Sequence, residues 1–572
     1  MLLRHPSTGQ RSSASRRGGF VIVAVLMVVT VLSLAAYQYS ALMDAEVLAA
    51  ERIRKSTEAK ALADSGIYHA MAHVADPDAF EGVLNSNPFD NPGTFQSVQV
   101  NEGQSPRSQG RFSLIALDFG EDAAAGSIPT RFGMMDETAR LNINALFALD
   151  SSGKVLHDAL MKLPNMTDEV AWSIVDWVDP NDEPSAGGAE NEYYTARTPN
   201  YLCKNAPLDT VEELLLVKGV TPSLLFGSDR NRNGKLDPGE DDGMGFTPGW
   251  AAFLTVYSRE RNVDVDGNPR INLNGNDMNQ LKTDLVAVVG EELTTFILAY
   301  RLFGSGTSSG TGGTSGSSSP ATVTMVETPG QGGAFSLKLT GTSSGASGGT
   351  TQGTIPQLAT IVADAIAKKT QPKQRISSLF ALISATVSAQ MPSQNGTSSG
   401  GSGKGGNSQS QSPTLSFKSP LADQAKQVDM LGKMLDKTTT QQGAELPAKV
   451  NVNTAPRAVL LALPGITEAD ADSIEAKRPQ YLNGESPDPK FATIAWLMAD
   501  NTLTVAKMQA LERYITARTQ VYRVQSIGYF DEAGPMARVE AVIDTNQGKP
   551  RIVYYRDLTD LGRSIDPRSL NR

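Results

Sequence analysis

The chain has 572 residues, which is enough for two or three domains that each bury a core of their own. Its formal net charge is -10, and this balance argues against nucleic acid as the main partner, because nucleic-acid-binding proteins present dense basic surfaces. A single cysteine, Cys203, excludes an internal disulfide and a cysteine-rich metal site.

The amino-terminal segment predicts one membrane span. Residues 1–19 are basic and contain no acidic residue, and residues 20–36 read FVIVAVLMVVTVLSLAA without a charge. Tyr37 and Tyr39 follow, where an interfacial aromatic belt is expected. The positive-inside rule then places the leader in the cytoplasm and the rest of the chain outside it. No small-residue cleavage site follows the apolar run, unlike in a secretory signal peptide.

The span continues into a long helix. No proline or glycine occurs from Phe20 to Ser65, and Ile67, Met71 and Val74 keep a helical apolar stripe as far as Pro77. The pattern predicts a transmembrane and stalk helix over 20–75. At about 1.5 Å per residue it reaches roughly 80 Å, so its second half must project from the membrane.

The residues before this helix, Arg16-Arg17-Gly18-Gly19-Phe20, resemble the class III signal of type IV pilins and pseudopilins. The resemblance implies that prepilin peptidase cleaves after Gly19 and that Phe20 becomes an N-methylated first residue. Most members carry a glutamate at the fifth mature position, where this chain has Ala24. The K-type minor pseudopilin of type II secretion also lacks that glutamate, which suits a subunit at a fibre tip with no neighbour to neutralise. A plain signal-anchor helix is the alternative.

Three short segments repeat a basic residue followed by apolar-Asn-apolar-Asn. They are Arg140–Asn144, Arg270–Asn274 and Lys449–Asn453. Each alternates like a short strand and precedes a helical stretch, so we expect the last asparagine of each to cap the next helix.

A helix-hairpin-helix unit is predicted after the third repeat. Helices over 459–463 and 467–477 flank the turn Pro464-Gly465, and Leu208–Val220 forms a related unit. Such hairpins contact DNA in some proteins. Acidic residues directly after the turn would repel phosphate here, so the pattern favours packing over DNA binding.

Strand-like segments bracket the helical region, at 111–118, 129–134, 521–530, 537–544 and 551–557. The predicted class is therefore α+β, with a pilin-like antiparallel sheet into which a large helical domain is inserted, and this layout resembles the K-type pseudopilins. The expected order is a prepilin leader at 1–19, the long helix at 20–75, the first segment of the sheet domain at 76–139, the inserted helical domain at 140–516, and the second segment of the sheet domain with the tail at 517–572. Residues 304–420 are rich in Ser, Gly and Thr, and we expect flexible linkers around brief helical or strand pieces there.

Residues 229–240, DRNRNGKLDPGE, follow the twelve-residue calcium-loop template of EF-hands. The expected ligands are the side chains of Asp229, Asn231, Asn233, Asp237 and Glu240 and the backbone carbonyl of Lys235. We expect a Ca2+ at this loop to be structural, and a chance Asp/Asn-rich loop is the alternative. A second acidic group fits no template but is a candidate for another ion: Asp179, Asp182, Glu183, Glu190 and Glu192.

No catalytic motif accompanies these features, so we expect no enzyme. The resemblance implies a minor pseudopilin that caps the pseudopilus tip in type II protein secretion. It is expected in the bacterial inner membrane as a single-pass protein with a cytoplasmic amino terminus and a periplasmic main domain. The implied partners are the I-type and J-type minor pseudopilins, prepilin peptidase and exported proteins. The alternatives are a DNA-uptake or type IV pilus minor pilin, and a calcium-dependent surface-anchored binding protein.

Overall fold

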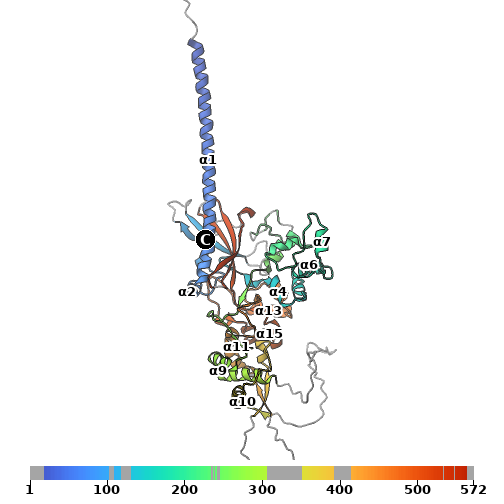
Figure 1. Ribbon diagram of the computed structural model, residues 1–572. Coiled ribbons are helices and arrows are strands. Elements are labelled where there is room, and N and C mark those ends of the chain that lie inside the picture. Colours follow the sequence, from blue (N-terminus) through green and yellow to red (C-terminus); the bar gives the residue numbers. More distant parts are fainter. Residues whose placement is uncertain are drawn as a thin grey trace, which may run out of the picture.

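The computed structural model is a long rod joined to an elongated body (Figure 1). It describes residues 18–101, 109–117, 130–232, 236–237, 239–240, 245–305, 351–391, 414–531, 534–546 and 548–562. The rod and a sheet occupy one end of the body, and helical layers extend the other end away from the rod (Figure 1).

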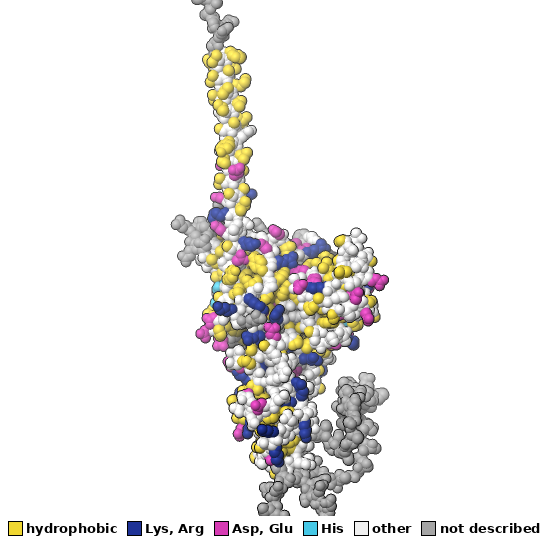
Figure 2. Space-filling view, in the orientation of Figure 1, with side chains coloured by type: hydrophobic (Ala, Val, Ile, Leu, Met, Phe, Trp, Pro, Cys, Tyr) yellow, Lys and Arg dark blue, Asp and Glu magenta, His cyan; other side chains and the backbone are white. Residues whose placement is uncertain are grey.

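The rod is helix α1, Gly18–Ala75, which confirms the predicted long helix. Residues 20–54 are exposed along its free part, and its most apolar 18-residue window has a mean hydropathy of 2.7 with none of it buried. Apolar side chains cover this free part, and charged side chains gather nearer the body (Figure 2). By length and composition it is the one helix among the described residues that is able to cross a membrane. The leader residues 1–17 lie outside the described residues.

The sheet joins strands from both ends of the chain in the order β1-β2-β16-β17-β18, and every pair is antiparallel. These strands are β1 (Val98–Asn101), β2 (Gly110–Leu117), β16 (Val521–Phe530), β17 (Ala537–Asp544) and β18 (Arg551–Asp557). Two short strands flank them, β3 (Thr130–Arg131) on β2 and β4 (Met135–Asp136) on β16. The predicted sheet is thus confirmed, and β1 is an addition to it.

The predicted strand at 129–134 is wrong in its extent. Within 130–136 the chain forms β3 and β4 with a break between them, because Phe132 and Met134 bond to the loop at residues 88–91 instead of to a strand. The backbone also passes close to that loop at Gly133, where an added Cβ would lie 2.4 Å from the carbonyl oxygen of Phe89.

The second half of α1 packs on one face of the sheet. Its side chains Ala59, Ala63 and Ile67 are buried against apolar residues of β2, β16 and β17. Helix and strand meet most closely at Gly528 of β16, where a Cβ would lie 2.1 Å from the Ala59 carbonyl oxygen. The stalk is therefore fixed to the sheet, while its free half is not.

The helical region lies between β4 and β16 in sequence and shares one hydrophobic core that extends from Leu141 to Ile515. Its helices are α4 (Ile143–Leu149), α5 (Lys154–Leu160), α6 (Asp168–Val178), α7 (Asn191–Thr195), α8 (Pro222–Phe226), α9 (Met278–Phe303), α10 (Ile355–Ala367), α11 (Gln424–Lys437), α12 (Arg457–Leu461), α13 (Glu468–Lys477), α14 (Trp496–Ala499) and α15 (Val505–Leu511). Two-residue strand pairs join these helices, and at the far end β10 (Thr386–Gln390), β11 (Thr414–Lys418) and β9 (Thr351–Gln352) form a small sheet.

The three repeats occupy equivalent positions in this region. In each repeat an apolar-Asn pair forms a two-residue strand that pairs in parallel with a later segment: β5 (Leu141–Asn142) with β6 (Leu254–Thr255), β8 (Ile271–Asn272) with β12 (Thr438–Thr439), and β14 (Val450–Asn451) with β15 (Ile515–Thr516). The repeated sequence therefore marks repeated pairing between distant segments.

The expected capping role of the last asparagine is wrong. Asn144, Asn274 and Asn453 each use the side-chain amide to bond backbone groups of a distant segment, at Leu208, Ile376 and Phe491 respectively. Helix α4 is capped by Asn142 instead, through its bond from the Ala145 N–H. A side-chain amide offers both a donor and an acceptor, so it satisfies a passing backbone strand better than a single helix terminus.

Two short helices, α12 and α13, lie on either side of the turn at Gly465, which has a φ of 78°. In the related segment the first helix is a 3-10 turn, η3 (Val211–Leu216). The helix-hairpin-helix assignment itself stays a prediction.

Residues 351–391 and 414–420 are packed elements, and α10 buries Leu358, Ile361 and Val362. The linkers at 306–350 and 392–413 lie outside the described residues.

Candidate functional site

The processing site predicted at Gly19 and Phe20 lies in the first turn of α1. Phe20 is 80% exposed, and α1 begins at the end of the rod farthest from the body (Figure 1). Residues 20–54 are exposed, so no part of the body that the structure describes shields Phe20. Cleavage after Gly19 stays a prediction.

The described portion of the loop at 229–240 folds around the carboxylate of Glu240. One carboxylate oxygen accepts the N–H groups of Arg230 at 3.0 Å and Asn231 at 3.1 Å, and the other accepts the N–H of Asp237 at 3.4 Å. The Asn231 amide donates to Asp237 at 2.6 Å, while its buried Oδ1 makes no hydrogen bond within the described portion of the chain. Positions 3, 9 and 12 of the template are thus close together. Asn233 and Lys235 lie outside the described residues.

Arg538 of strand β17 fastens this loop to the sheet. Its guanidinium donates to the carbonyl of Arg232 at 2.9 Å and to that of Asn231 at 2.6 Å, and the side chain is 1% exposed. Burial lowers the pKa of Arg538 to about 10, and nearby Asp229 opposes that shift. The loop is therefore a contact between the helical region and the sheet.

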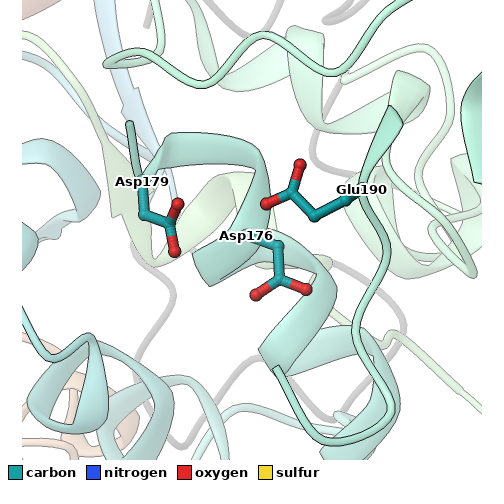
Figure 3. A group of neighbouring side chains, drawn as sticks. All are labelled: Asp176, Asp179 and Glu190. Carbon is teal, nitrogen blue, oxygen red and sulfur yellow. The ribbon is translucent and has the colours of Figure 1, made fainter. Parts of the chain in front are cut away.

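A second acidic cluster forms between α6 and α7. It consists of Asp176 and Asp179 at the end of α6 and Glu190 before α7, and their carboxylate oxygens lie within 4.8 Å of one another (Figure 3). All three residues are buried, and both carboxylate oxygens of Glu190 are buried with no hydrogen-bond partner among the described residues. Such a group suits a divalent cation, which prefers several carboxylate oxygens.

Burial dominates the electrostatics of this acidic cluster, and Lys218 opposes its effect at Asp176. Burial raises the pKa of Glu190 to about 7, and the carboxylates of Asp176 and Asp179 add to that shift. Burial likewise raises the pKa of Asp176 and of Asp179. Backbone N–H groups hold the Asp176 carboxylate in place, because it accepts those of Ser185 at 3.1 Å and Ala189 at 2.8 Å.

Of the five acids predicted for this second site, only Asp179 and Glu190 lie in the cluster. Asp182 is exposed and accepts the backbone N–H and the side-chain amide of Asn191 at 3.3 and 2.8 Å, and Glu183 and Glu192 are exposed. Asp176 completes the cluster but was not predicted as a ligand. Its spacing of three from Asp179 places both on one helix face, which was the available signal.

Buried charges join the sheet to the helical region. Arg523 of β16 forms a two-pronged ion pair with Glu137, at 2.7 Å for each bond, and a third bond to Glu540 of β17 at 2.5 Å. The neighbouring Asp136 accepts the side chains of Asn451, Thr454 and Thr519. Burial raises the pKa of Asp136. This junction holds the third repeat, through Asn451, against strand β4, which pairs with β16.

Comparisons with known proteins match a portion of this architecture. Residues 139–226 match the family model described as Type II secretion system (T2SS), protein K. The type II secretion system protein K of Klebsiella pneumoniae is 47% identical over 49 residues, which are 9% of this chain and 15% of that protein. The chain thus matches about one seventh of that relative's length.

A solved structure is similar over a longer range. It is the crystal structure of the GspK-GspI-GspJ complex from the type 2 secretion system of enterotoxigenic Escherichia coli, and the similarity covers 89% of this chain and 98% of that chain. The sequence identity is 9% and the TM-score is 0.30. A likeness of that size carries no conclusion about shared function.

Proposed function

We propose that this chain, a K-type pseudopilin of a type II secretion system, caps the tip of the pseudopilus and serves in its assembly. The free apolar half of α1 would insert first into the inner membrane and then among the helices of I-type and J-type pseudopilins. The body would lie in the periplasm, where exported proteins pass. The role is structural, and we assign no catalytic step to the chain.

The observation that carries this proposal is the division of α1 into an exposed apolar half and a half fixed to the sheet. An exposed apolar surface of this length needs lipid or partner helices to cover it. The helical region then adds bulk beyond the sheet, at the end of the body away from the free half of α1 (Figure 1). Such bulk favours a terminal position, because subunits inside a fibre must stack closely.

Immunogold labelling of assembled pseudopili tests the tip position. Antibodies against the helical region should mark one end of each fibre, and labels distributed along the fibre would contradict the proposal.

Co-purification with the I-type and J-type pseudopilins of the same cell should depend on the free half of α1. A control variant with an exposed change in the body, Lys282→Ser, should co-purify normally.

The processing proposal has a separate test. Mass spectrometry of the protein isolated from its membrane should find an amino terminus at Phe20 with one added methyl group. A chain that still begins at Met1 would support the surface-anchored alternative.

Calcium binding is proposed at both acidic groups, the loop at 229–240 and the Asp176/Asp179/Glu190 cluster. The described donors fit calcium in kind, since all are carboxylate or amide oxygens. The ion would neutralise buried negative charge and stabilise the helical region after export. Equilibrium dialysis of the metal-stripped protein against Ca2+ should find two bound ions per chain, and no bound ion would exclude both sites.

The DNA-binding alternative is less well supported. Arg457, at the start of α12, forms ion pairs with Glu468 at 2.6 Å and Glu475 at 3.0 Å, and it also pairs with Asp472. These acids neutralise a cation that phosphate contact would need. Duplex DNA at physiological salt should therefore show no micromolar binding to the full chain.

A further inference from the structure

A large groove lies in the helical region, and no residue of the two acidic groups that we propose for calcium lines it. Its volume is about 1040 Å³, and it lies among the β8–β12 pair, the segment 375–381 and helix α15. That volume is slightly above the range of about 300–1000 Å³ for small-molecule sites. The groove has room for several residues of an extended peptide.

Positive charge dominates this groove, although the whole chain is acidic. Five cationic side chains line it: Arg270, Arg375, Lys449, Arg513 and Arg518. Two acidic side chains also line the groove, and each already interacts with a neighbouring residue. Glu260 lies 3.6 Å from Arg270, and Glu512 accepts the Leu379 N–H at 3.0 Å. Glu260 keeps one buried oxygen without a hydrogen bond among the described residues.

A buried cation strengthens this excess. Arg301, at the end of α9, is 2% exposed and donates to the backbone carbonyls of Gln374 and Gly275, next to groove residues Arg375 and Asn274. No carboxylate pairs with it among the described residues, and its buried Nε makes no hydrogen bond there. Burial lowers the pKa of Arg301, and the nearby Arg375 adds to that shift, so these two cations lie close enough to interact at this wall of the groove.

Three of the five cations form no salt bridge within the described residues, although Lys449 lies near enough to Glu512 to oppose the rise in its pKa. Arg375 and Arg513 are exposed, and Lys449 is half-buried. No salt bridge or side-chain hydrogen bond joins any of these three to a described residue, although Arg513 lies over the Tyr514 ring. Ser377, Thr440 and Gln441 add polar side chains along the same groove. Spaced guanidinium and ammonium groups with neutral donors between them suit carboxylates on an extended chain.

We propose that this groove binds an extended acidic peptide segment of another protein, with Arg375, Lys449 and Arg513 as its principal contacts. The assignment concerns this groove alone and holds whether or not the chain caps a pseudopilus.

Fluorescence anisotropy on the full-length protein in detergent tests the proposal. The probe is a fluorescein-labelled octapeptide of alternating Asp and Ser, and its partner probe replaces every Asp with Asn. We expect binding of the acidic probe alone, and a loss of roughly tenfold or more in affinity when salt rises from about 50 to about 500 mM. Equal binding of both probes would overturn the proposal.

A matched pair of triple variants locates the site. Arg375→Glu/Lys449→Glu/Arg513→Glu should weaken binding at least about tenfold, since three attractive contacts are lost and repulsion replaces them. Lys282→Glu/Lys373→Glu/Lys433→Glu changes the net charge equally, but these lysines do not line the groove. This second variant should change affinity less than about twofold, and equal weakening in both variants would refute the site.

A photo-crosslinking version of the acidic probe keeps the test informative if the first variant misfolds. Mass spectrometry of the unmodified protein should place the crosslinks at groove residues such as Ser377 and Gln441. Crosslinks confined to the calcium loop, to the linker segments or to the carboxyl-terminal tail would contradict the proposal.

Discussion

The two acidic groups of this protein differ in how their carboxylates are satisfied. In the loop, Glu240 accepts three backbone N–H groups, and Arg538 binds the loop carbonyls. In the cluster, both oxygens of Glu190 are buried without a hydrogen bond among the described residues, and its pKa is raised to about 7. Hydrogen bonds within the loop thus satisfy Glu240, whereas the buried carboxylate of Glu190 in the cluster lacks a hydrogen-bond donor among the described residues.

This difference shows that a matching sequence template and a physical need for an ion are separate properties. The loop matches the EF-hand spacing, yet its acids have alternatives to an ion. The cluster matches no spacing, yet burial of three carboxylates is costly without a cation. We therefore expect the cluster to contribute more than the loop to stabilisation by calcium.

The largest expected effect comes from removing the cluster. At free calcium about 100 times the dissociation constant, one site adds about 2.7 kcal/mol to the free energy of unfolding. Asp176→Asn/Glu190→Gln should abolish that gain at the cluster, as measured by thermal unfolding in calcium and in chelator. The matched loop variant, Asp229→Ala/Glu240→Gln, should retain it. A larger loss in the loop variant would reverse the comparison.

Removing the attachment of the loop should have a slightly smaller effect. Arg538→Met leaves the carbonyls of Asn231 and Arg232 without their donor, which costs roughly 1–3 kcal/mol. Urea unfolding in chelator should detect this cost, and the cluster should still respond to calcium. A variant with unchanged stability would show that the loop does not depend on the sheet.

A change in pH should act mainly on the cluster. Because burial raises the pKa of Glu190 from 4.5 to about 7, the folded state binds more protons than the unfolded state in that interval. In chelator, this contribution to stability is present below pH 4.5 and is lost as pH rises to about 7. Glu190→Gln should flatten that slope in melting temperatures recorded from about pH 4.5 to about pH 8. An unchanged slope would place the titrating group elsewhere.

The smallest effect is expected for the acids that the structure leaves outside the cluster. Asp182→Asn and Glu183→Gln are exposed changes and should alter stability by less than about 0.5 kcal/mol. Their calcium titrations should match the unmodified protein. A large loss of affinity would mean that the loop at 179–192 rearranges around the ion.

Much of the fold could be predicted from local patterns. The apolar run from Phe20 predicted the rod, and alternation predicted β16, β17 and β18, because each of these patterns is contained in a single element. The break near Gly133 was not predictable, since it depends on a distant loop at Phe89.

The two acidic groups differ in the same way: one is continuous in sequence, and the other depends on contacts between separate segments. The loop at 229–240 is continuous in sequence, so its template was visible. The cluster needs Glu190 to return to Asp176, and that return passes Gly188, where a Cβ would lie 1.9 Å from an Asp176 oxygen. The roles of Asn144, Asn274 and Asn453 depend on partners 38 to 102 residues away along the chain, which no local pattern reveals.

The asparagine contacts also bear on how such a chain tolerates changes in length. Asn274 precedes residues 306–350 in the chain and forms hydrogen bonds with the backbone of Ile376, which follows them. Ser305 likewise forms a β-bridge with Val387. The register of the fold is thus set by contacts on both flanks of that tract. A fluorescent reporter spliced between 306 and 350 would leave these contacts intact, which makes this tract a natural place to tag the protein in living cells.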